Sequence, residues 1–264
     1  AQFSDRVQFD IDSWPRYHRL AAQALALAPL AGRAAAPDRE RAAGFVHQAA
    51  LFLRHATGDL STVRRLYENN LKAVAAASGE ESDHYAAALG NLAAALDLLG
   101  EDAAAEARYR EAIAVREAAT EEGDPRRAYE HNNLGGFYVR RGRFDEAETE
   151  LKWAYRINTT AEGVPPALVA SSTGNLGTLY SDWADATGDA EKRRLAMDYQ
   201  TRALRLTRAA LGPAHPETAV RHHNLAAEHL LAGDAPAAAA QQLRAAAIML
   251  ALARAGAIPE THPN

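Results

Sequence analysis

The chain has 264 residues, of which 48% are hydrophobic and 24% are charged, and its formal net charge is −5. This negative balance, without a stripe of basic residues interleaved with aromatic ones, argues against a nucleic-acid partner. No apolar run reaches the roughly 18 residues of a membrane span, so we expect a cytoplasmic protein that does not bind membrane. The absence of cysteine excludes disulfides, thiolate metal sites and cysteine nucleophiles.

Helical patterning runs along the whole chain, and the predicted elements come in pairs. Apolar residues recur at helical spacing, no segment alternates as a strand does, and alanine, the best helix former, is abundant. The first element is a helix near residues 13–30, inside a lead-in region of residues 1–37. Five helix pairs follow, at about residues 38–57 with 60–77, 83–99 with 102–119, 125–141 with 144–160, 165–186 with 189–210, and 216–232 with 235–256. The sequence therefore predicts an all-α chain.

A short phrase repeats along these pairs, in the forms GNLAAALDLLG, NNLGGFYVRRG, GNLGTLYSDWA and HNLAAEHLLAG. Its asparagines are separated by 42, 42 and 49 residues, and they are Asn91, Asn133, Asn175 and Asn224. A glycine suited to the left-handed turn follows three of the copies, and the same spacing places a degenerate copy before the first. These turn glycines are Gly58, Gly100, Gly142 and Gly233.

The second helix of each pair carries a small or polar residue where it would press against the first helix. Twelve residues after the turn glycines stand Asn70, Ala112, Ala154 and Ala245. The fourth copy is longer, with its turn at Gly188 and its packing alanine at Ala203. One added turn per helix keeps the apolar faces in register, so we expect this hairpin to protrude.

The repeated phrase resembles the tetratricopeptide-repeat (TPR) motif, best in HNNLGGFYVRRGRFDEAETELKWAYRIN at residues 131–158. The period of 42 and the linker LGPAHPET at residues 211–218 are similar to kinesin light chain repeats. The resemblance implies a right-handed TPR superhelix of about five helix-turn-helix repeats plus an N-terminal helix. The solenoid would span residues 38–264, with repeats at about 38–80, 83–123, 125–163, 165–213 and 216–257.

The segment DIDSWPRYHRLAAQALALA, at residues 10–28, resembles the helix that leads into TPR arrays of bacterial STAND-class regulators. In those proteins an NB-ARC-type ATPase precedes the repeats. The resemblance implies that this chain is the sensor part of a bacterial switch protein. The chain has no Gly-x-x-x-x-Gly-Lys-Ser/Thr loop, so it carries no ATPase of its own, and we expect no cofactor.

The resemblance also implies a concave groove, lined by the first helix of each pair, that binds a peptide or a partner domain. The asparagine of each Asn-Leu pair would face this groove, where an amide can donate to and accept from a peptide backbone. The predicted peptide-binding residues are Asn91, Tyr129, Asn132, Asn133, Arg140, Asn175, Thr178, His223 and Asn224. Further groove candidates are Gln48, Phe52, Asp97, Ser171 and Asp182. In the alternative interpretation, the asparagines bond the neighbouring repeat and serve only its curvature.

No enzyme or metal site is predicted. Four histidines, His215, His222, His223 and His229, cluster in the sequence but lack the converging ligands of a zinc site. No nucleophile, base and orienting group occur together. The chain would therefore be a protein-interaction module, and the alternative function is a structural scaffold that forms homo-oligomers without a peptide ligand.

Tryptophans are sparse, and we expect Trp14, Trp153 and Trp183 to be core anchors. Trp183 lies in the lengthened fourth hairpin, where an exposed partner surface is the alternative.

Overall fold

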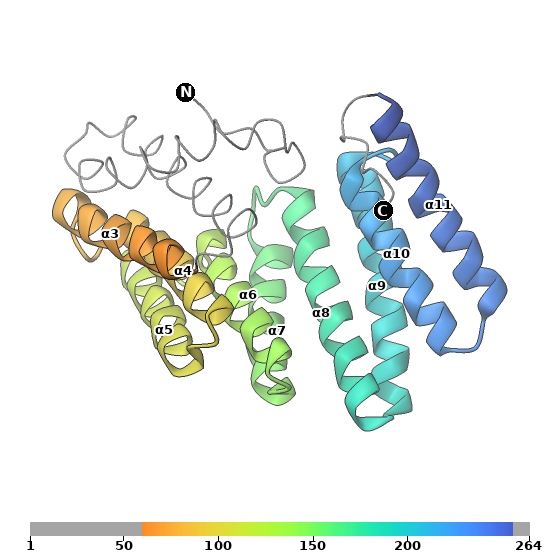
Figure 1. The fold of residues 1–264 in the computed structure, drawn as a ribbon, viewed down its shortest axis with the longest axis horizontal. Coiled ribbons are helices and arrows are strands. Elements are labelled where there is room, and N and C mark those ends of the chain that lie inside the picture. The colour runs from red at the N-terminus through yellow and green to blue at the C-terminus, as the bar shows by residue number, and fades with distance from the viewer. Residues whose placement is uncertain (1–59, 256–264) are drawn as a thin grey trace. The chain divides into compact units, whose positions relative to one another are not determined.

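The computed structural model describes residues 60–255, which contain nine helices and no strand (Figure 1). Contacts divide the described residues into two compact units, residues 60–122 and residues 123–255. The all-α prediction is confirmed. The lead-in helix, the helix at 38–57, Gln48, Phe52 and Gly58 lie outside the described residues, and the repeat boundaries stay predictions.

The first unit contributes three described helices, α3 (Leu60–Ser78), α4 (Asp83–Leu98) and α5 (Asp102–Ala119). Helix α4 packs between the other two. Its apolar face joins a core cluster made of Val74, Tyr85, Ala88, Leu89 and Ala112. The start of α4 is capped by Ser82, whose Oγ accepts a hydrogen bond from the Tyr85 amide at 3.2 Å.

The second unit is a series of three hairpins. They pair α6 (Pro125–Arg140) with α7 (Phe144–Thr160), α8 (Pro166–Thr187) with α9 (Ala190–Leu211), and α10 (Pro216–Leu231) with α11 (Ala235–Arg254). Successive hairpins pack through α7 against α8 and through α9 against α10, as Figure 1 shows. Every described helix lies within two residues of its predicted bounds, because repeated turn and cap residues mark its ends.

The turn glycines adopt the predicted left-handed conformation. Gly100, Gly142, Gly188 and Gly233 have φ angles of 75°, 69°, 71° and 80°. An L-residue in that region suffers a clash of its Cβ with the backbone, so glycine ends these helices without strain.

The predicted close-packing positions are buried, as expected. Ala112, Ala154 and Ala203 have no exposed surface, and Ala245 and Asn70 are also buried. The first helices also carry small residues where they approach the second helices. A Cβ added at Gly135 would lie 2.6 Å from Leu151 Cγ, too close for any real contact.

The lengthened fourth hairpin has two helices of 22 residues, against 16 in α6 and 17 in α7. The residues that flank its added turns pack on α7 and on each other. Trp183 stacks on Phe144 with ring centroids 5.6 Å apart, and Lys192 Nζ lies 3.6 Å from the centroid of the Trp183 ring. Trp183 is half-buried, so its environment lies between the core position and the exposed partner surface that were predicted for it.

Candidate functional site

One stripe of each first helix in the second unit stays accessible to solvent. The leucine of the repeated phrase is buried in all three helices, as Leu134, Leu176 and Leu225, whereas the asparagine before it is half-buried. Helix geometry turns neighbouring side chains about 100° apart, so burying the leucine brings the asparagine toward the surface.

We call these surfaces the accessible stripe and define it by positions −4, 0, +3 and +7 relative to each asparagine. It consists of Tyr129, Asn133, Gly136 and Arg140 on α6, Ser171, Asn175, Thr178 and Asp182 on α8, and Val220, Asn224, Ala227 and Leu231 on α10. Every one of these residues is half-buried or exposed. The stripe is polar and aromatic on α6 and α8 but mainly apolar on α10.

Two of the predicted asparagines bond each other across neighbouring hairpins. Asn175 Nδ2 on α8 donates to Asn132 Oδ1 on α6 at 3.0 Å, and Asn132 Nδ2 donates to the Ala128 carbonyl at 2.9 Å. This bond matches the alternative interpretation, in which the amides join adjacent repeats. It still leaves Asn175 Oδ1 without a hydrogen-bond donor among residues 60–255.

The other predicted residues of this unit differ in how far they are exposed to solvent. Asn133 and Asn224 are half-buried, Tyr129 is 57% exposed, and Arg140 is exposed. Thr178 Oγ1 donates to the Gly174 carbonyl within its own helix at 3.2 Å.

Asn91 and Asp97 are half-buried on α4. This helix belongs to the first unit, so they are not grouped with the stripe of the second unit.

Two histidines of α10 pair with two glutamines of α11. His222 Nδ1 lies 2.6 Å from Gln241 Oε1, and His223 Nδ1 lies 3.0 Å from Gln242 Oε1. Burial lowers the pKa of His222, and the positive charge of Arg244 acts in the same direction. His223, a predicted groove residue, is thus engaged with the second helix of its own hairpin.

A buried carboxylate links the last two hairpins. Glu228 on α10 accepts hydrogen bonds from Ser181 on α8 and from Arg193 on α9, the latter at 3.2 Å. Arg193 also pairs with Asp185. Partial loss of hydration raises the pKa of Asp182 on the accessible stripe, and the charges of Asp185 and Glu228 raise it further.

A second polar cluster joins α7 to the fourth hairpin. Tyr180 donates to Glu148 Oε1 at 2.6 Å, and Lys152 Nζ lies 2.7 Å from the same oxygen. Burial raises the pKa of Tyr180, and its hydrogen bond to Glu148 adds to this rise. Burial acts to raise the pKa of Glu148, but the bonds from Lys152 and Tyr180 hold it below its usual range. The phenol therefore stays protonated and holds the hairpins together.

Within residues 60–255 no three His, Asp or Glu side chains are arranged to hold a metal ion. In the same part of the chain, no helix combines the length and the apolar character that crossing a bilayer requires.

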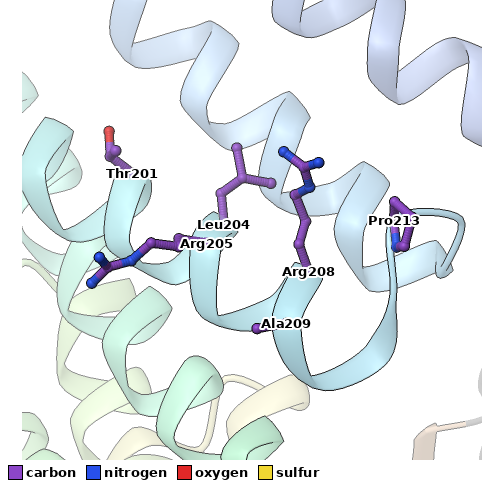
Figure 2. A pocket seen from close by; sticks show the side chains of 6 residues that line it. All are labelled: Thr201, Leu204, Arg205, Arg208, Ala209 and Pro213. Atoms are coloured by element: carbon purple, nitrogen blue, oxygen red, sulfur yellow. The ribbon is translucent and has the colours of Figure 1, made fainter.

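A concave surface lies on α9 and the linker that follows it (Figure 2), and it borders a space of about 440 Å³. It is lined by Thr201, Leu204, Arg205, Arg208, Ala209 and Pro213. Sequence reasoning missed this site. The available signal was the spacing of arginines in TRALRLTRAALGP at residues 201–213, because residues three and seven positions apart share a helix face.

Comparison with known proteins supports the repeat assignment. A family model described as tetratricopeptide repeat matches residues 86–126. The crystal structure of BtubC (BKLC) from P. vanneervenii superposes with a TM-score of 0.69 and 25% identity, covering 94% of each chain. A second crystal structure, from Podosopora anserina, is described as kinesin light chain nearly identical TPR-like repeats. It matches with a TM-score of 0.58 and 18% identity, covering 80% of this chain and 94% of that chain.

No curated protein matches the chain. The matched repeat, the hairpin series and these solved structures agree on one architecture, which in general supports protein–protein interaction. The chain therefore contains a tetratricopeptide repeat at residues 86–126, and its fold is similar to that of solved structures with TPR-like repeats.

Proposed function

We propose that the chain binds an extended segment of a partner protein along the accessible stripe of α6, α8 and α10. The observation that carries this proposal is the contrast at the repeated Asn-Leu pair. The leucine is buried in each of the three helices, while the asparagine and its stripe neighbours keep access to solvent. The core is filled by the leucine, so the side chain of the asparagine remains available for binding a ligand.

The chemistry of the stripe suits a peptide backbone with side chains of mixed character. Asn175 keeps an acceptor oxygen, and Asn133 and Asn224 make no side-chain hydrogen bond within the described residues, so each can donate and accept. Tyr129 supplies a large amphipathic surface at low entropic cost. Val220 and Leu231 on α10 favour an apolar side chain at that end of the segment.

The test uses a displayed library of random peptides, selected on the wild-type chain. Selected peptides are then titrated against a double variant, Asn133→Ala with Asn175→Ala. We expect at least about a tenfold loss of affinity, since each lost backbone hydrogen bond contributes about 1 kcal/mol.

The matched control makes two polar-to-alanine changes on α7, Thr149→Ala with Thr159→Ala, where both residues are exposed. Circular dichroism must show equal helicity for all three proteins, because the Asn175 amide also bonds Asn132. Equal affinity of the selected peptides for both double variants would contradict the proposal.

A second candidate function is self-association through the last hairpin. Large apolar side chains are exposed on α10 and α11, namely Leu230, Leu231, Leu243, Met249 and Leu250. Exposed apolar side chains at the end of a repeat array are candidates for contact with another chain. Light scattering at several concentrations tests this idea. A wild-type oligomer that becomes monomeric in Leu243→Glu supports the scaffold, and a monomer throughout removes it.

We also infer that this binding serves a regulatory role, as the sensor part of a STAND-type bacterial protein. The support is the resemblance of residues 10–28, which lie outside the described residues. The reading frame upstream of Ala1 tests the inference. A Gly-x-x-x-x-Gly-Lys-Ser/Thr loop encoded there supports it, and an unrelated upstream sequence or a start codon contradicts it.

A further inference from the structure

The concave surface on α9 brings two arginines next to an apolar wall. Arg205 and Arg208 lie three residues apart, and Ala209, Pro213 and the buried Leu204 line the surface with them. Figure 2 shows Leu204 and Arg208 extending to the same side of α9, while Arg205 extends along its flank. The surface is an open depression with a volume of about 440 Å³, which suits a short peptide lying on it.

The wall formed by Pro213 is held in place by the linker. Gly212 N donates to the Arg208 carbonyl at 3.1 Å, and Thr218 Oγ1 donates to the Gly212 carbonyl at 2.8 Å. These bonds tie the linker to the end of α9 and to the first turn of α10. The concave surface is therefore preformed, which reduces the entropy lost when a ligand binds.

The two arginines have no carboxylate partner in the part of the chain that the structure describes. The acidic residues closest to them in sequence are engaged elsewhere. Asp198 pairs with Arg194 at 2.9 Å, and Glu217 pairs with Arg221 at 2.7 Å. The positive charge of Arg208 also reaches the buried His222 and contributes, after burial, to lowering the pKa of that imidazole.

We propose that this surface is a second binding site, which takes a carboxylate-bearing segment of a partner protein with an apolar residue next to its acidic one. Guanidinium groups recognise carboxylates through paired, charge-assisted hydrogen bonds. The exposed side chains of Ala209 and Pro213 offer the apolar contact. The local positive charge of Arg205 and Arg208, beside an apolar surface, makes a short acidic peptide the matching ligand.

This site is independent of the accessible stripe, because it lies on the second helix of its hairpin. Either site can bind without the other. The probe is a fluorescein-labelled hexapeptide, Leu-Glu-Glu-Leu-Glu-Glu, and its isostere with glutamine in place of glutamate. Fluorescence anisotropy on the full chain should show binding of the glutamate peptide, weaker at high salt, and at least tenfold weaker binding of the glutamine peptide.

The decisive variant is Arg205→Gln with Arg208→Gln, and both residues are exposed, so folding is preserved. Its matched control is Arg156→Gln with Arg202→Gln, which removes the same charge from exposed positions outside the site. We expect at least a tenfold loss of affinity in the first variant and less than a twofold change in the control.

Three results would overturn the proposal. The first is no binding of the glutamate peptide to the wild type, which would leave Arg208 only the role of balancing the helix dipole at the end of α9. The second is equal weakening in both double variants, which indicates diffuse charge attraction. The third is displacement of the probe by a single-stranded oligonucleotide at lower concentration than by unlabelled glutamate peptide, which assigns the site to phosphate. Unchanged binding in the Asn133→Ala, Asn175→Ala variant separates this site from the accessible stripe.

Discussion

The fourth and the last hairpins share one repeat pattern but differ in what covers them. Helix α9 packs between α8 and α10, and its buried residues run along its length from Ala196 to Thr207. Helix α11 has one neighbour among the described helices, α10, and it buries only Ala238 and Ala245. In a repeat array each hairpin gains its burial from its neighbours. The same motif therefore stabilises one hairpin strongly and the other weakly.

The difference extends to polar groups. The fourth hairpin is tied on both sides, through Tyr180 to Glu148 and through Ser181 and Arg193 to Glu228. The last hairpin has histidine–glutamine pairs between its own two helices, and several of its leucines are exposed. We expect the last hairpin to open at lower free energy than the fourth, as less covered elements do.

The largest expected effect comes from removing a leucine in each hairpin. Leu176 has no exposed surface, whereas Leu243 is 71% exposed. Leu176→Ala leaves a cavity and should lower the free energy of unfolding by about 3 kcal/mol, and Leu243→Ala should change it by less than about 0.5 kcal/mol. Urea unfolding followed by circular dichroism measures both. Similar losses in the two variants would mean that α11 is covered as fully as α8.

Enlarging a packing alanine tests the same contrast from the other side. Ala203 on α9 is fully buried, and Ala247 on α11 is exposed. Ala203→Leu forces α8 and α9 apart and should cost about 2 kcal/mol, while Ala247→Leu meets only solvent. Thermal unfolding of the two variants shows the difference as a lower midpoint for Ala203→Leu alone. A raised midpoint for that variant would show an unfilled space beside Ala203.

The polar contacts of Glu228, which connect the fourth and last hairpins, should contribute less to the free energy of unfolding than the packing of Leu176 and Ala203. Glu228→Gln keeps the size of the side chain but removes the charge that Arg193 and Ser181 contact. We expect a loss of about 1–2 kcal/mol in unfolding free energy, because a charge-assisted hydrogen bond becomes a neutral one. The control, Glu162→Gln, changes an exposed carboxylate between α7 and α8 and should leave the urea midpoint unchanged. An equal midpoint for both variants would remove Glu228 as a connector.

The smallest effect is a pH dependence centred on the last hairpin. The pKa of His222 lies below its ordinary value of 6.5, because burial disfavours the charged form beside Arg244 and Arg208. As the pH falls below about 6.5, the unfolded chain takes up the proton first, so stability falls until the pH reaches the pKa in the folded chain. The urea midpoint should therefore decrease from pH 7.5 to pH 5.5.

The matched variants are His222→Gln and His223→Gln. His222→Gln removes the titrating group and should flatten the decrease, and His223→Gln should keep it, since His223 is exposed. A decrease of the same size in His222→Gln would place the titrating group elsewhere.

Most of the helix map was predictable because local chemistry specifies it. Gly142 and Gly188 end helices since only glycine tolerates the left-handed turn, and Asp189 caps α9 by accepting from the amide of Glu191 at 2.8 Å. The turn glycine and the capping aspartate each act on backbone within a few residues of their own position in the sequence. The repeat period added the register between copies, which is how the extended fourth hairpin was recognised.

The candidate site was only partly predictable. The sequence placed the asparagines beside buried leucines, and helix geometry then brought them near the surface. It did not indicate that Asn175 would bond Asn132 or that His223 would pair with Gln242. Such contacts depend on how neighbouring helices are spaced and rotated, which no local pattern encodes.

The sequence by itself determined the all-α repeat architecture, since helix propensity, turn glycines and small packing residues act locally and recur along the chain. Only the tertiary structure decided which arginines form ion pairs with carboxylates and which do not. Arg193 and Arg205 stand in the same helix of the same repeat, yet Arg193 contacts carboxylates of α8 and α10, while Arg205 lines an open surface. Partner choice by a long charged side chain depends on distances between helices, and these exist only once the hairpins have packed.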